Sequence, residues 1–356
     1  GGRKRRRKES RDRADVKKTS SKFPNEIQRN PRNDPKWYFK DRRLLEDTAS
    51  FSFSQPLGTR LHFNQYHLPT GKDVNKVGAS SVPGLMTVRL ALTPGIAVSA
   101  EDPVNIAATN VYSYVRYKNS GSTNYDAPDL MMYLLAMDSL YACWNWMQRI
   151  YGFASMYSQT NRYLPRAYME ANNVDFDDVM AHLADFRAWL NIKANSISAF
   201  CVPATMTYNI RHSWLFSNIF KDSDTNKAQQ YMYIPAWFYK YDETSSPKGG
   251  QLVPVIAVPN DVGTAAKYKV ADLMLMLNKM IEAVNYAEDI GIMSGDILKA
   301  YGEGNLFKLS SVDPDYKVEA VHSAEVLWQI ENMHCLYAGT TDISQFNIVQ
   351  DPSTNF

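Results

Sequence analysis

Cysteine is scarce in this chain of 356 residues, which contains only three. Cys143, Cys201 and Cys335 lie far apart, and each stands in an apolar stretch. The pattern does not resemble a disulfide framework, and it predicts small, buried thiols in a reducing compartment. The chain also lacks an Asn-X-Ser/Thr acceptor site and shows no signal sequence, and together these features predict a cytosolic product.

Recognisable catalytic motifs are also missing. There is no phosphate-binding loop, and no Ser, Cys or His stands in a nucleophile motif. Gly302 and Gly304 supply the first two glycines of a dinucleotide-binding fingerprint, but the third is absent. The chain is therefore predicted not to be an enzyme, and to bind no cofactor and no small-molecule substrate.

Acidic residues and histidines do not gather at metal-ligand spacing. Residues 175–178 hold three carboxylates, and Asp222 and Asp224 form a second acidic group. Both sets could be drawn as metal ligands, but a helix cap explains the first and a turn explains the second. His62 and His67 have no further Cys or His nearby. The sequence thus predicts no metal site.

Apolar residues are abundant, and they concentrate in residues 126–220, which hold 17 of the 44 aromatic residues. Residues 129–157 are apolar almost all the way round a helix, with a thin polar stripe at Asp138, Asn145, Arg149 and Gly152. Such a helix would be roughly 43 Å long at about 1.5 Å per residue. It is predicted to be buried on most sides and wrapped by other helices.

A membrane-spanning helix is the alternative for this segment, because residues 130–147 contain a single charge, Asp138. Tyr and Trp are spread along the segment instead of collecting at its ends, and a central Asp costs about 2.5–3.5 kcal/mol on insertion. Both features favour a buried helix in a protein without a membrane.

Charge is divided unevenly along the chain. Residues 1–43 carry 17 Lys and Arg against 6 Asp and Glu, which gives a net charge of +11, whereas the remaining residues carry 22 against 31, which gives −9. The first 22 residues contain one sizeable apolar residue, Val16, so they are predicted not to fold alone. A basic arm on an acidic body indicates a polyanion held by the arm.

The arm is predicted to bind RNA or DNA without reading bases, because each cation that neutralises a phosphate releases counterions. A nuclear-import signal and a merely solvated tail remain as alternatives. After the arm, three prolines and then Trp37-Tyr38-Phe39 predict a stiff linker ending in an anchor. The predicted RNA-binding residues are Arg3, Lys4, Arg5, Arg6, Arg7, Lys8, Arg11, Arg13, Lys17 and Lys18.

Strands are predicted in two parts of the chain. Residues 49–93 alternate apolar and polar positions between many Pro and Gly residues. Residues 231–241 are predicted to form a strand pair bent at Pro235, followed by a hairpin-type loop over 242–250 and a strand over 252–258.

Helices are predicted where a 3.6-residue apolar period follows a capping residue. In the apolar and aromatic segment 206–220, His212 is interpreted as the partner in a core hydrogen bond rather than a ligand. The predicted helices run from Pro103 to about Lys118, over 161–173 with an interruption near Pro165, over 175–197 before Pro203, over 270–290 with a stop at Gly291, and after Asp313-Pro314 as far as Gly339.

Several packing motifs resemble the capsid proteins of picobirnaviruses, which enclose double-stranded RNA. The likeness is strongest from about 126 to 250, and it is carried by packing residues rather than by an active-site signature. The motifs are Tyr133-Leu-Leu-Ala-Met-Asp138-Ser-Leu-Tyr141, Asn161-Arg-Tyr-Leu-Pro165, Ala184-Asp185-Phe186-Arg187, Cys201-Val-Pro203, Arg211-His-Ser-Trp214, Asn218-Ile-Phe, Lys227-Ala-Gln and Phe238-Tyr-Lys240.

The resemblance implies a mainly helical α+β shell subunit that forms dimers, and then a small icosahedral shell around viral double-stranded RNA. On this basis we expect a basic arm over 1–43, a shell domain over 44–226, a β-rich projecting segment over 227–262 and a helical continuation over 263–356. The expected location is the virion and the cytoplasm of the infected cell. Members of this family are usually longer, which leads us to expect a further C-terminal portion.

Two other functions stay open on the sequence alone. An RNA-coating nucleoprotein would need a basic groove in the body as well as the arm. An RNA-processing enzyme would use the arm as an electrostatic anchor, with Asp177 or Asp222 in its catalysis.

Overall fold

The computed structural model describes residues 85–158, 164–224, 228–243, 250–260, 262, 264–333, 342–351 and 353–356. The predicted arm, the aromatic anchor and the predicted strands before Leu85 lie outside these residues. The helices are α4 (Pro103–Lys118), α5 (Ala127–Ala154), α6 (Leu164–Ala171), α7 (Phe176–Ala181), α8 (Leu183–Ser198), α9 (Thr207–Ser217), α10 (Val270–Asn285), α11 (Glu288–Tyr301) and α12 (Ala324–Glu331). The strands are β1 (Leu85–Ala91), β2 (Ile219–Lys221), β3 (Gln230–Asp242), β4 (Gln251–Ile256), β5 (Ala320–His322) and β6 (Ile348–Val349), with short 3-10 turns at η1 (Glu303–Asn305) and η2 (Ile343–Phe346).

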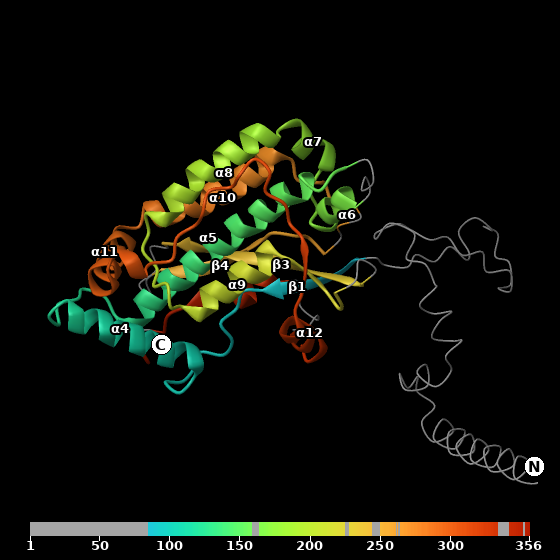
Figure 1. Cartoon of the computed structure of the whole chain (residues 1–356). Helices are drawn as coiled ribbons and strands as arrows, with labels where there is room; N and C mark the ends of the chain where they lie inside the picture. The colour runs from blue at the N-terminus through green and yellow to red at the C-terminus, as the bar shows by residue number, and fades with distance from the viewer. Residues whose placement is uncertain are drawn as a thin grey trace, which may run out of the picture. The chain divides into compact units, whose positions relative to one another are not determined.

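Helix α5 is the centre of the fold, as its apolar composition predicts. It runs through the middle of the molecule and packs against α4, α6, α8, α9, α10 and β3 (Figure 1). Of its 28 residues, 24 are buried. Asp126 and Asp129 form a capping box at its first turn, which satisfies backbone N–H groups that have no partner within the helix. The predicted long, wrapped helix is confirmed.

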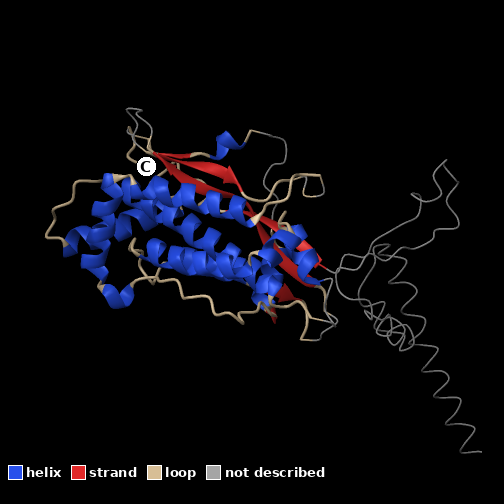
Figure 2. Ribbon diagram, turned by 90° about the horizontal axis from the view of Figure 1, so that it is seen from above, coloured by secondary structure: helices blue, strands red, loops and turns tan. Residues whose placement is uncertain are grey.

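A six-stranded mixed sheet lies against this helix. The strand order is β5-β2-β3-β4-β6, and β1 pairs in parallel with β3. Most of the helices lie on one side of the sheet (Figure 2). Tyr239 in β3 donates its backbone N–H to the hydroxyl of Ser139 in α5 at 3.0 Å, which ties the two layers together. The predicted α+β, mainly helical class is confirmed.

Strand β3 corrects one sequence prediction, because it continues through Pro235 as one strand instead of bending into a pair. Leu90 of β1 lies opposite Pro235, but the next residue of β1, Ala91, lies opposite Trp237, so Ala236 is an extra residue in the ladder. Proline cannot donate to a ladder, and a bulge beside it accommodates the missing N–H group. The sequence prediction places a break at this proline, because no local pattern indicates the bulge.

The segment predicted to project, 227–262, supplies β3 and β4. These strands pair antiparallel with Asp242 opposite Gln251, so the predicted hairpin is present, although residues 244–249 lie outside the described part. Met232, Phe238 and Leu252 are buried in the same core as α5. Their place relative to the surface of an assembled shell stays a prediction, as does the division of the chain into domains.

Helix boundaries differ from the predictions where a cap was assigned to the wrong residue. Gly291 does not stop the helix that begins at Val270: α10 ends at Asn285, α11 begins at Glu288, and the stop is Gly302, whose φ of +80° suits glycine. Pro165 lies in the first turn of α6, where proline is tolerated, and residues 161–163 of the predicted helix lie outside the described part.

Two further predicted helices are also corrected. The helix predicted over 175–197 is divided at His182 into α7 and α8, although Phe186, Leu190 and Ile197 are buried on one face as expected. Asp313 and Pro314 form a turn, closed by the N–H of Tyr316 on the Asp313 carbonyl, and do not cap a helix. The nearest helix, α12, begins after Ser323, and Gly339 lies outside the described residues.

Candidate functional site

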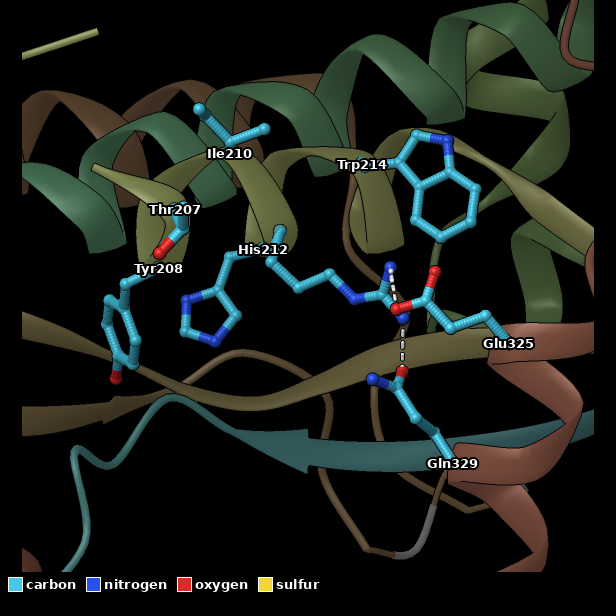
Figure 3. Close-up of a pocket in the computed structure, with 8 residues that line it drawn as sticks. Thr207, Tyr208, Ile210, His212, Trp214, Glu325 and Gln329 are labelled. Atoms are coloured by element: carbon cyan, nitrogen blue, oxygen red, sulfur yellow. Dashed lines mark hydrogen bonds and ion pairs between the residues drawn. The ribbon is translucent and has the colours of Figure 1, made fainter. Parts of the chain in front are cut away.

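The ten predicted RNA-binding cations, from Arg3 to Lys18, all lie outside the residues that the structure describes. Their role therefore stays a prediction. Within the described part, polar side chains meet at a groove between α9 and α12 (Figure 3). Some of these side chains are largely buried, and others are exposed to solvent. Its volume is about 560 Å³. It is lined by Thr207, Tyr208, Ile210, Arg211, His212, Trp214, Glu325 and Gln329.

The outer wall of the groove is a bridge from Arg211 on α9 to α12. The Arg211 guanidinium lies 3.4 Å from the Glu325 carboxylate, and it donates a hydrogen bond to the side-chain oxygen of Gln329 (Figure 3). It also lies 4.8 Å from the centre of the Trp214 ring. Glu325 and Gln329 are four residues apart, so both point from one face of α12. The bridge links this short helix to α9.

The inner end of the groove leads to a buried acid. Nδ1 of His212 lies 2.8 Å from Oδ2 of Asp138 in α5, and the Tyr208 ring packs edge-on against the imidazole at 4.2 Å between ring centres. Asp138 is only 1% exposed. Burial raises the pKa of the Asp138 carboxyl above its ordinary value, and the neighbouring His212 opposes that shift. The predicted core hydrogen bond of His212 is confirmed.

Arg149 forms a second buried polar centre, on the same stripe of α5. It is fully buried, and its guanidinium donates to the carbonyl oxygens of Asn218 at 3.2 Å and Tyr233 at 2.6 Å. It also reaches Oδ1 of Asn172 at 3.4 Å and the carbonyl of Leu215 at 3.5 Å. Burial lowers the pKa of Arg149 to about 9.

These contacts give Arg149 a structural role. Leu215 and Asn218 lie at the C-terminal end of α9, where unpaired carbonyls carry partial negative charge and favour a cation. Tyr233 belongs to β3. Arg149 therefore joins α5, α9 and β3. Arg149 stands on the polar stripe in the sequence, but no sequence signal identifies its carbonyl partners on α9 and β3, which lie 66 to 84 residues away.

The predicted acidic candidates serve local structure. Asp175 caps α7 by accepting the N–H of Asp178, as predicted. Asp178 also accepts the N–H of Val270, and Asp177 pairs with Arg166 at 2.9 Å. Asp222 and Asp224 are exposed near the end of β2. Within the described ranges, no three His, Cys, Asp or Glu side chains gather as a metal site would require.

Two of the three cysteines can be placed. Cys143 and Cys201 are free and buried, which confirms their predicted burial, and Cys335 lies outside the described residues. Burial raises the pKa of the Cys143 thiol well above its ordinary value, so it stays protonated and unreactive. None of the described helices is long and apolar enough to cross a membrane.

Comparisons with known proteins identify the family. The sequence profile described as "Picobirnavirus, Capsid protein" matches residues 37–355. A capsid protein precursor of human picobirnavirus is 35% identical over 338 residues, which are 92% of this chain and 60% of that relative. The chain thus spans about 60% of the length of the curated relative that it matches.

A solved structure supports the same assignment. The X-ray crystallographic structure of the picobirnavirus capsid matches with a TM-score of 0.72 and 30% sequence identity, over 90% of this chain and 63% of the other. The match at the level of the fold covers almost the same share of this chain as the match in sequence. The chain belongs to the picobirnavirus capsid protein family.

Proposed function

We propose that this chain is a shell subunit that associates into symmetric dimers and then into a small icosahedral shell around double-stranded RNA. In this proposal the body makes the protein contacts, and the cations between Arg3 and Lys18 hold the RNA without reading its sequence. The product would function in the virion and form in the cytoplasm of the infected cell.

The division of charge supports this proposal most strongly. Residues 1–43 carry a net charge of +11 and the rest of the chain −9, so RNA is attracted to the arm and not to the body as a whole. Membership in the capsid protein family supports a structural role. That family is not enzymatic, so the prediction that the chain is not an enzyme is confirmed, and the RNA-processing alternative is set aside.

Negative-stain imaging of the purified protein tests the shell. We expect closed particles of uniform diameter. If the protein gave only small soluble species at high concentration, the proposal would be wrong. Open filaments on RNA would instead support the nucleoprotein alternative.

Deletion of residues 1–22 tests the arm separately. The shortened chain should still assemble but should lose most of its affinity for a duplex RNA, because all ten predicted RNA-binding residues are removed. A nucleoprotein would keep most of that affinity.

The salt dependence of RNA binding is a further test of the arm. For the full chain, the logarithm of the affinity should fall by about 0.9 for each phosphate contact per unit increase in the logarithm of the salt concentration. A flat salt response would exclude the arm from RNA binding.

A further inference from the structure

A pocket separate from the α9–α12 groove lies where α10 meets the strands β3 and β4, and its volume is about 500 Å³. Lys240 of β3 and Val255 of β4 line it from the sheet. Leu275, Met276 and Lys279 line it from α10. Leu275 and Met276 stand four and three residues before Lys279, so all three lie on one face of the helix. Charged and apolar side chains therefore meet in one cavity of the size that small ligands occupy.

The remaining wall of this pocket is the segment 266–268, which backbone hydrogen bonds hold in place. Tyr268 donates its N–H to the Asn173 carbonyl at 2.7 Å, and its carbonyl accepts the N–H of Asp175 at 2.8 Å. The side-chain amide of Asn173 donates to the carbonyl of Ala266 at 3.0 Å. The Tyr268 side chain therefore lines the pocket from a backbone that is fixed on both sides.

Two cations of this pocket have no counter-ion among the described residues. Lys267 forms an ion pair with Glu170 at 3.2 Å, and Asp272 accepts a backbone N–H at the start of α10 at 2.9 Å. Lys240 and Lys279, by contrast, make no ion pair with any described residue. The pocket thus keeps two unpaired ammonium groups, although the chain after the basic arm carries a net charge of −9.

We propose that this pocket binds a nucleotide through its phosphate monoester. Such a group carries about −1.5 to −2 charges at neutral pH, which matches the ammonium groups of Lys240 and Lys279. The ring of Tyr268 and the thioethers of Met276 and Met280 offer the base an apolar, polarisable surface. This inference goes beyond the proposed function and does not depend on it, because it uses the body of the chain and not the arm.

Other anions match the pocket less well. An inorganic anion would leave its apolar side uncovered, including Leu275, which is 54% exposed. The interior of an RNA duplex offers only phosphodiesters with one charge each, and its bases are stacked away from a side pocket. A phosphate monoester with an accessible base is present in a free nucleotide and at the 5′ end of a single RNA strand.

The first test titrates the full chain with adenosine monophosphate (AMP) at physiological salt and measures the heat of binding. Adenosine should bind at least about tenfold more weakly, because it lacks the phosphate. Lys240→Met and Lys279→Met should each weaken AMP binding about tenfold by removing one ammonium group.

Lys299→Met is the matched control for these two variants. Lys299 lies in the last turn of α11, outside the pocket lining, and its substitution changes the net charge equally. The affinity for AMP should change less than about twofold, because salt screens distant charges. Equal affinities for adenosine and AMP, or equal losses in all three lysine variants, would overturn the proposal.

The second test examines the base and the location of the site. Ribose 5-phosphate has the monoester but no base, so Tyr268→Leu should weaken AMP binding at least about fivefold and leave ribose 5-phosphate binding unchanged. Photolabelling of the full chain with 8-azido-AMP should mark peptides that contain residues 266–280. A label confined to residues 1–43, or to another part of the body, would contradict the proposed site.

The third test identifies the source of the nucleotide with an RNA trinucleotide that carries a 5′ phosphate and its 5′-hydroxyl form. If the phosphorylated form binds as tightly as AMP and the hydroxyl form does not, the ligand is the end of an RNA strand. If AMP alone binds, the ligand is a free nucleotide. Binding of neither AMP nor the phosphorylated trinucleotide overturns the proposal. Particle formation and RNA binding by the arm are measured separately, so the shell function stands or fails independently.

Discussion

Charged side chains make polar contacts both in the interior around α5 and at the groove between α9 and α12, but those in the interior are buried and those at the groove are partly exposed to water. In the interior, Asp138 and Arg149 are enclosed on all sides, and each is held by named partners. At the groove, Arg211 and Glu325 form an ion pair, but the Glu325 side chain remains largely exposed to water. Water can replace a lost partner only in the groove. The difference shows that burial, more than distance or charge, determines how much a polar contact contributes to the free energy of unfolding of this protein.

The largest effect is expected at Arg149. Arg149→Met keeps much of the side-chain volume but leaves the carbonyls of Asn218 and Tyr233 without a donor in the interior. The free energy of unfolding should fall by about 3 kcal/mol or more, since each unsatisfied buried group costs about 1–3 kcal/mol. Urea unfolding at a fixed protein concentration measures the change. A loss below about 1 kcal/mol would mean that the interior is not closed to water.

Gly152 should give the next largest effect, because it lies where α5 has no room for a side chain. A Cβ atom there would come within 2.4 Å of Val318 Cγ2 and 2.9 Å of the Tyr316 ring. Gly152→Ala should therefore destabilise the protein by about 1–3 kcal/mol, the usual cost of overpacking.

Gly295→Ala is the control for this prediction. Gly295 also lies within a helix, α11, but a Cβ there meets nothing within 4 Å. This variant should be more stable by up to about 1 kcal/mol, because alanine favours the helix. Thermal unfolding of the two variants should therefore shift in opposite directions. Equal shifts of one sign would show that helix propensity and not packing decides both sites.

Asp138 should make stability depend on pH. Its folded-state pKa lies above the ordinary value, so the folded protein binds a proton that the unfolded chain has already lost. Between the ordinary pKa and the raised one, stability should fall as pH rises, with a slope of at most about 1.4 kcal/mol per pH unit. Asp138→Asn removes this titration. The difference between the two unfolding free energies, measured from pH 4 upward, should carry that slope, and a constant difference would contradict the burial of an ionisable Asp138.

The smallest effect is expected at the groove. A double-mutant cycle with Arg211→Gln and Glu325→Gln should give a coupling energy below about 1 kcal/mol, because solvent screens an exposed pair. Added salt should reduce it further. A coupling as large as the Arg149 effect would show that the groove is closed in solution and would remove the contrast between the two regions.

Much of the fold could be predicted because it depends on neighbours in the sequence. The apolar circumference of α5, the cap at Asp175 and the start of α4 after Asp102 are local patterns, and the structure has each of them. Local patterns also caused the errors. Gly291 and Asp313-Pro314 are common cap residues, but α11 continues past the first and a turn contains the second.

The groove, by contrast, could not be predicted. Its two walls are in contact in space but are more than 110 residues apart in the sequence, as the hydrogen bond between Arg211 and Gln329 shows. The aromatic character of segment 206–220 is visible in the sequence, and it favours a core hydrogen bond for His212. No periodic signal showed that α12 would lie across from α9.

The sequence by itself determined that a basic arm precedes an acidic body and that one long, almost entirely apolar helix must be buried at the centre of that body. Composition and periodicity are enough for this, because hydrophobic burial and charge repulsion depend on residue type and spacing. Only the tertiary structure decided which groups meet: His212 with Asp138, Arg149 with the end of α9 and with β3, and α12 with Arg211. The partner of a buried polar group is selected by the packing of distant segments, and no local pattern encodes that choice.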